Sequence, residues 1–217
     1  MSDSPLLTAA LVVSLLLLCW YLVGMQYNIR RGRRALKWIE QGLPVIGEKA
    51  ALNWSGVSQV QIHIAQAKEP FRSADVLIQL KPRELPFWWF WQPRAPTHDL
   101  LILRAQLHHA PGFDLVSHSP RVPADEQLKR HGVGQWSAVQ GGLANAMNAD
   151  LRGALSPYTV NRLIVQTTLE GMTLTRLIVR RAAPNLEVHY LLPKFEQVSP
   201  QRLFTILHQL GEEILQV

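Results

Sequence analysis

Hydrophobic positions form one unbroken stretch near the N-terminus, over Leu6–Met25, and no charged residue interrupts it. At a rise of 1.5 Å per residue, a helix of this length covers about 30 Å, the hydrocarbon thickness of a bilayer. Its polar side chains are Thr8, Ser14 and Tyr21, too few for the polar stripe of a helix in a soluble core. The pattern predicts a membrane-spanning helix over 6–25, after a short extracytoplasmic tail over 1–5.

A cleaved signal peptide is the alternative interpretation of an N-terminal apolar run. Signal peptides have a basic n-region, a short apolar core and a small-residue cleavage site. The first five residues contain no Lys or Arg, and the apolar run continues into QYNIRRGRRALK without an A-x-A pattern. The sequence therefore favours a retained anchor.

Positive charge is concentrated directly after the apolar run. The chain has a net charge of +6, and the basic cluster of the 26–47 segment comprises Arg30, Arg31, Arg33, Arg34 and Lys37. Such a cluster follows the positive-inside rule and attracts anionic head groups, at about 1 kcal/mol per basic residue near the surface. It predicts an outside N-terminus and a cytoplasmic C-terminal domain in the cell (plasma or inner) membrane. The rest of the chain is nearly neutral, which disfavours nucleic-acid binding.

The helix is expected to continue beyond the span as a basic juxtamembrane segment. Its pattern runs to Gln41, where Gly42 suits a left-handed C′ position and Pro44 prevents continuation. Trp20, Tyr21 and Tyr27 fit the aromatic belt of a membrane interface.

Strand patterns begin near residue 48. Val60, Ile62 and Ile64 alternate with polar residues, as in a strand with one buried face. Residues 74–82 and 98–107 are denser apolar runs, and residues 112–119 follow a Pro-Gly turn. Short links between such strands indicate an antiparallel sheet.

The second half of the chain is expected to add helices and a second group of strands. A short helix is predicted at 124–132, and a helix over 143–155 from the four-residue spacing of Leu143, Met147, Leu151 and Leu155, closed by Ser156 and Pro157. Strands are predicted at 160–169, 172–181 and 185–193. Ser199 and Pro200 then mark the N-cap and N1 of a last helix, with Leu203, Ile206, Leu207, Leu210 and Ile214 on its buried face.

The order of strands, helix, strands and helix predicts an α+β domain over 48–217, with helices on one side of a mainly antiparallel sheet. A subdomain break near 132–142 is the minority alternative.

The stretch ELPFWWFWQPR holds five consecutive aromatic residues between prolines. Pro86 and Pro93 lack amide donors, which suits a loop better than a central strand. Aromatic side chains flanked by basic ones are typical of a membrane interface, and the predicted contacts here are Phe87, Trp88, Trp89, Trp91 and Arg94. Core packing and a protein–protein contact are the alternatives.

Catalytic and metal signatures are weak. The sequence has neither GxxxxGK[ST] nor GxGxxG, and its eight histidines form no HxxxH, HExxH or HxH pattern. Ser117 and His118 are neighbours on an expected strand, the wrong geometry for a nucleophile and its base. Cys19 lies within the apolar run and is the only cysteine, so the remainder has no thiolate ligands. No cofactor, metal or catalytic residue is predicted.

These patterns predict a non-catalytic, single-pass accessory, scaffold or assembly protein, whose partners are the bilayer and another membrane protein. The alternative is a membrane-tethered enzyme or binding domain acting on a lipid or a membrane-bound ligand. A deep pocket with convergent polar groups would favour the alternative.

Overall fold

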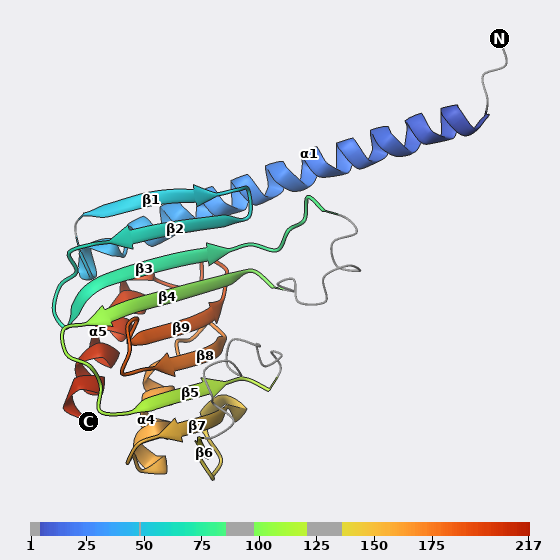
Figure 1. Cartoon of the computed structure of the whole chain (residues 1–217). Coiled ribbons are helices and arrows are strands. Elements are labelled where there is room, and N and C mark those ends of the chain that lie inside the picture. Colours follow the sequence, from blue (N-terminus) through green and yellow to red (C-terminus); the bar gives the residue numbers. More distant parts are fainter. Residues whose placement is uncertain (1–4, 48, 86–97, 121–135) are drawn as a thin grey trace.

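The computed structural model describes residues 5–47, 49–85, 98–120 and 136–217. A long N-terminal helix, α1 (Pro5–Glu40), leads into a sheet whose strand order is β1-β2-β3-β4-β9-β8-β5-β7-β6 (Figure 1). All neighbouring strands pair antiparallel. The strands are β1 (Ala50–Ser55), β2 (Gln59–Ile64), β3 (Phe71–Gln79), β4 (Leu100–Leu107), β5 (Asp114–His118), β6 (Ser137–Ala138), β7 (Asn148–Arg152), β8 (Leu174–Val179) and β9 (Leu186–Leu191).

The strands expected from alternation are present. On β2, Val60, Ile62 and Ile64 are buried, while Gln61 and His63 are exposed on the other face. The expected strands at 74–82, 98–107, 112–119, 172–181 and 185–193 correspond to β3, β4, β5, β8 and β9. The mixed α+β class with a mainly antiparallel sheet is therefore confirmed.

The helix predicted over 143–155 is wrong. Only a 3₁₀ turn at Ala144–Ala146 is helical there, and strand β7 follows it. Asn145 and Ala146 have φ of 56° and 52°, which a continuous α-helix excludes. Ala149 and Leu151 are buried at a spacing of two and β7 pairs with β5, so tertiary pairing overrides the four-residue apolar spacing.

The strand predicted over 160–169 is also wrong, because helix α4 (Pro157–Gln166) occupies that segment. Its buried residues, Val160, Leu163 and Ile164, have helical spacing. Ser156 accepts a hydrogen bond from the backbone N–H of Thr159 at 3.1 Å. Ser156 and Pro157 therefore begin a helix, where the prediction had them end one.

The last helix, α5 (Pro200–Gln216), begins as predicted, with Ser199 as its N-cap. The predicted apolar positions face inward, with Ile206 only partly buried. At the end of α1, Gly42 has a φ of −99°, so the predicted left-handed conformation is wrong. A Cβ on Gly42 would lie 2.8 Å from the carbonyl oxygen of Pro200, so the close approach of α5 explains the glycine.

Helices α1, α4 and α5 pack with one set of strand residues into a single hydrophobic core. The part of α1 that reaches this core buries one stripe, Gly24, Asn28, Gly32, Ala35 and Ile39, at spacings of three or four. The N-terminal part of α1 extends beyond the sheet (Figure 1). This part is long and apolar enough to cross a membrane, and its most apolar window has no buried residue. The short helix predicted at 124–132 lies outside the described residues.

Candidate functional site: a polar cluster between the apolar helix and the sheet

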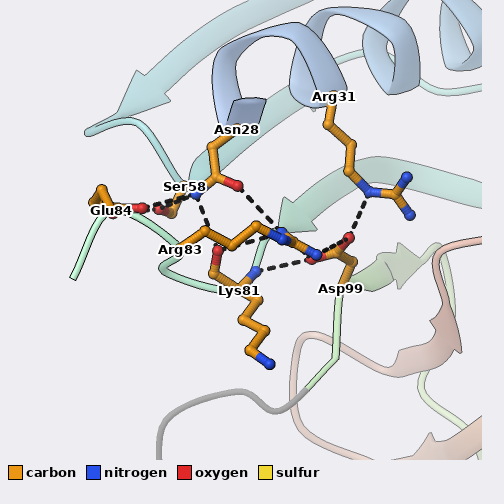
Figure 2. Close-up of polar contacts among 7 residues, drawn as sticks. All are labelled: Asn28, Arg31, Ser58, Lys81, Arg83, Glu84 and Asp99. Carbon is orange, nitrogen blue, oxygen red and sulfur yellow. Dashed lines mark hydrogen bonds and ion pairs between the residues drawn. The ribbon is translucent and has the colours of Figure 1, made fainter. Parts of the chain in front are cut away.

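A polar cluster joins α1 to the sheet three residues after the apolar run ends. Its members come from α1, from the β1–β2 turn and from the two ends of the β3–β4 connection (Figure 2). They are Asn28, Arg31, Ser58, Lys81, Arg83, Glu84 and Asp99. Residues far apart in the sequence thus meet on one face of the helix.

Asn28 is fully buried and has partners for both ends of its amide. Its Nδ2 donates to the carbonyl oxygen of Lys81 at 3.0 Å and to Oε2 of Glu84 at 2.8 Å, and its Oδ1 accepts from Arg83 at 3.1 Å. Ser58 donates to the second oxygen of Glu84 at 2.7 Å. A buried amide is costly without such partners, so these bonds select one rotation of α1 against the sheet.

Asp99 is the anionic centre of the cluster, with a side chain only 6% exposed. Arg83 binds both of its oxygens, at 2.9 and 3.0 Å, and Arg31 donates Nε–H to Oδ2 at 2.5 Å. The backbone N–H of Lys81 donates to Oδ1 at 2.9 Å. Burial alone would raise the pKa of Asp99, but the hydrogen bond from Arg83, the Lys81 N–H and the two cationic side chains together lower it.

The 81–85 segment lies along α1 beside the end of the apolar run. The indole N–H of Trp20 donates to the carbonyl oxygen of Arg83 at 3.0 Å. A Cβ on Gly24 would lie 2.6 Å from the same oxygen, so only glycine permits this approach. The guanidinium of Arg83 lies 4.9 Å from the ring centroid of Tyr27, a cation–π distance.

This packing leaves an apolar groove of about 610 Å³ between α1 and the 81–85 segment. The helix lines it with Leu16, Cys19, Trp20, Val23, Gly24 and Tyr27. Lys81 and Arg83 lie on its other side. The groove therefore combines an apolar wall with a basic end.

A second polar group lies on the sheet face opposite the core. Nε2 of His189 is 2.5 Å from Oε1 of Glu187, and Arg104 donates to Oε2 of Glu187 at 3.1 Å. Burial opposes the ionisation of Glu187, but the bonds from His189 and Arg104 lower the pKa of Glu187 to about 2. Burial also lowers the pKa of His189, which keeps the imidazole neutral at pH 7.

The carboxylates of Asp75, Asp99 and Asp114 do not converge on a common centre. Asp99 binds Arg31 and Arg83, Asp75 binds His63 at 2.8 Å, and Asp114 accepts from the backbone N–H of Arg181 at 2.9 Å. Within the described part of the chain, no group of three His, Cys, Asp or Glu residues could hold a metal ion. Ser117 donates to the carbonyl oxygen of Asn148 at 3.0 Å, so its hydroxyl is used within the sheet.

Three residues of the predicted membrane interface belong to this region: Trp20, Tyr27 and Arg31. The remaining interface residues of α1 are exposed on its surface, namely Tyr21, Arg30, Arg33, Arg34 and Lys37. The aromatic-run residues Phe87, Trp88, Trp89 and Trp91, together with Arg94, lie outside the described residues. Lipid contact by all of these residues stays a prediction.

Sequence reasoning missed Asn28, Ser58, Glu84 and the role of Asp99. One signal in the sequence could have pointed to the contact. Gly24, Asn28 and Gly32 lie on the same face of the helix, and small and polar residues on one helix face indicate a close packing contact. No family model matches the chain, and no curated protein matches it.

Proposed function

We propose that this chain is a single-pass membrane-anchored accessory, scaffold or assembly protein. Its α+β domain is held against the cytoplasmic face of the bilayer, where it contacts another membrane protein. The N-terminus lies outside, and the basic cluster of α1 meets the inner head groups.

Two properties of α1 support the anchoring. Its apolar side chains are exposed over several turns, and Leu6, Leu11, Leu16 and Val23 are each more than half exposed. A solvent-exposed helix of this composition is costly in water and favourable in hydrocarbon, at about 25 cal/mol per Å² of apolar surface transferred. Arg30, Arg33, Arg34 and Lys37 are exposed just beyond it, at the positions that the positive-inside rule assigns to the cytoplasm.

One observation carries the rest of the proposal: the apolar helix continues without a break into the domain, and the polar cluster fixes it there. A flexible linker would let the domain turn freely above the membrane. Here Asn28 and Arg31 bind the 81–85 segment and Asp99 within two turns of Met25. Such a joint suits a protein that must present one surface at a constant height and angle.

The second candidate is a membrane-tethered domain that binds a lipid or a membrane-bound ligand. The observation that favours it is the apolar groove beside Trp20 and Val23, because ligand sites of a few hundred cubic ångströms are commonly apolar with a few polar groups. The two candidates are compatible, since an accessory subunit can also hold a lipid.

The anchoring is tested with Cys19, the only cysteine in the chain. In intact membranes we expect a water-soluble maleimide to leave Cys19 unlabelled, and the same reagent to label it after denaturation in sodium dodecyl sulfate. Rapid labelling in native membranes would contradict a membrane-embedded α1. A Cys19→Ser, Val217→Cys variant reports the orientation: its new cysteine should react with an impermeant reagent only after the cells are opened.

The accessory role is tested by purifying the full chain from its native membrane in a mild detergent. We expect it to elute with a stoichiometric membrane protein, at a size above that of the chain and its micelle. Elution as a monomer in each of several mild detergents would argue against an assembly role.

A further inference from the structure

The two edges of the sheet are built differently. Strand β6 ends one side of the sheet with two residues, whereas β1 ends the other side with six. The free edge of a sheet offers unpaired N–H and C=O groups to any extended chain. Proteins usually protect such an edge with a very short strand, a charge, a proline or a bulge. The two-residue β6 is a protected edge of the first kind.

Strand β1 has none of these protections. Its sequence AALNWS contains no charged residue and no proline, and all six residues pair with β2 without a register shift. Among the described residues, no strand pairs with its outer edge. Five of its six residues are exposed, and Leu52 is 48% exposed. Six residues of strand cover about 20 Å, so a regular backbone edge of this length is open to pairing.

The side chains of β1 give this edge two different faces. Trp54 lies on the face toward α1, because a Cβ on Gly32 would come within 3.0 Å of its ring. Leu52 shares that face, since successive side chains of a strand alternate, and Ala51 and Asn53 lie on the other. A strand added beside β1 would therefore meet apolar side chains on one face and small or polar ones on the other.

A second copy of this chain fits the edge less well. In Figure 1, β1 runs beside α1 and points back toward the apolar end of that helix. Two β1 strands related by a two-fold axis would pair antiparallel, so the second β1 would point in the opposite direction. The second α1 would then point away from the membrane that holds the first. Two copies in one membrane must insert their helices in the same direction, which this pairing prevents.

We propose that β1 adds one strand from another membrane protein to the sheet. The occupant is an extended segment with apolar residues at every second position. Its backbone bonds to the outward N–H and C=O groups of β1, and its apolar side chains pack beside Leu52 and Trp54 on the face toward α1. The inference rests on the proposed accessory role and deepens it, because it names the surface that holds the partner.

Hydrogen exchange tests the backbone pairing. The full chain is measured in its native membrane and again after purification in a detergent that removes other proteins. We expect the β1 amides that do not face β2 to exchange at least tenfold more slowly in the native membrane, and the amides of β6 to exchange equally in both samples. Equal exchange of the β1 amides in the two samples would overturn the proposal. Slow exchange in both samples, with a dimeric purified chain, would assign the edge to a second copy.

A charge placed on the edge tests the role of its apolar face. Leu52→Lys introduces a protection that natural edge strands use, and it should reduce the partner that elutes with the chain in mild detergent at least fivefold. Leu52→Val keeps an apolar side chain that favours strands and should retain the partner. Val165→Lys is the matched control, because Val165 is 52% exposed on α4, and it should also retain the partner. Equal losses in Leu52→Lys and Val165→Lys would contradict the proposal.

The same elution separates failure of the edge from failure of the accessory role. If Leu52→Lys elutes with as much partner as the wild type, the accessory role stands and the edge proposal is overturned. If the wild type elutes alone, the accessory role fails and the edge proposal fails with it. Leu52→Lys and the wild type should unfold at the same temperature in detergent, because residue 52 is half-exposed, so loss of the partner reports the edge and not the fold.

Discussion

Asp99→Asn is the substitution that most directly tests the joint between helix and sheet. Asp99 accepts hydrogen bonds from Arg31, from both terminal nitrogens of Arg83 and from the backbone N–H of Lys81. An asparagine of the same shape keeps one acceptor oxygen, but it presents an NH₂ group to a guanidinium and removes the negative charge. Two arginines then share a partly buried position without their counter-ion.

The loss of unfolding free energy in Asp99→Asn depends on how well water can solvate the two arginines once the carboxylate is gone. Removing one partner of a buried ion pair costs about 3–5 kcal/mol. The side chain of Asp99 is 6% exposed, whereas those of Arg31 and Arg83 are 30% and 28% exposed. Solvent therefore screens part of the loss, and we expect the free energy of unfolding to fall by about 2–3 kcal/mol. For a chain of this size the midpoint of thermal unfolding should fall by roughly 4–12 °C.

The assay is thermal unfolding of the full chain in detergent micelles, followed by the circular dichroism of the sheet. Asp75→Asn is the control, because Asp75 also contacts a basic side chain on the same sheet, that of His63, but Asp75 is 30% exposed and His63 is half-exposed. We expect the control to change the unfolding free energy by less than about 1 kcal/mol.

The reasoning is refuted if Asp99→Asn is no more destabilising than Asp75→Asn. The double variant Asp99→Asn, Arg31→Gln gives a second criterion. Because Arg31 has already lost its partner in Asp99→Asn, the double variant should be destabilised by less than the sum of the destabilisations measured for Asp99→Asn and Arg31→Gln alone. Simple additivity would mean that Arg31 and Asp99 do not stabilise the protein through each other.

Three further outcomes are expected. Gly24→Ala should destabilise the protein by about 1–3 kcal/mol, because its Cβ would lie 2.6 Å from the Arg83 carbonyl oxygen; at an unconstrained helix position the same change stabilises, so a raised unfolding temperature would contradict the contact. Acid should destabilise the protein in two steps. The first lies below pH 6.5, where the unfolded state binds the proton that buried His189 resists. The second lies between pH 4.5 and about 2 as Glu187 is titrated, and Asp99, whose pKa is also lowered, contributes to it. Glu187→Gln should reduce the second step in a series of unfolding temperatures against pH and leave the part that comes from Asp99. Tyr190→Phe should cost about 1–2 kcal/mol by calorimetry, because the buried Thr167 carbonyl loses its 2.7 Å bond; an unchanged unfolding enthalpy and temperature would contradict this.

Most strands could be predicted because their side-chain pattern had one interpretation. On β2 the alternation of Val60, Ile62 and Ile64 with polar residues fits only a strand with one buried face. The two errors in the type of element occurred where the pattern fits both periods. Met147, Ala149 and Leu151 can be read with a spacing of two or of four, and pairing with β5 decides for the strand. Residues 160–169 are rich in β-branched side chains, yet the cap at Ser156 and the packing on α5 make them a helix.

The polar cluster could not be predicted from local pattern because the contacts of α1 with the 81–85 segment and Asp99 cross 53 to 68 positions of the chain. Asn28 meets the carbonyl of Lys81 across 53 positions, and Arg31 meets Asp99 across 68. Arg31 had a sufficient explanation as part of the basic cluster, so nothing in its neighbourhood pointed to a buried carboxylate. Asp99 directly precedes strand β4, a position where a polar residue needs no explanation. Only the antiparallel register of β3 and β4 brings residues 81–84 and 99 to the same end of the sheet.

The helical register of α1 links the apolar part of the helix to the domain. The buried stripe of Gly24, Asn28, Gly32, Ala35 and Ile39 advances by three or four residues at each step. Continued toward the N-terminus, the same spacing gives Trp20 and Leu16, the residues that meet Arg83 and line the groove. An unbroken helix transmits rotation along its axis, so the bonds at Asn28 and Asp99 also determine which face of the apolar part lies beside the groove. One inserted residue between Met25 and Asn28 would rotate that face by about 100°, turning Leu16 and Trp20 away from the 81–85 segment. The joint and the groove therefore depend on a single helical register.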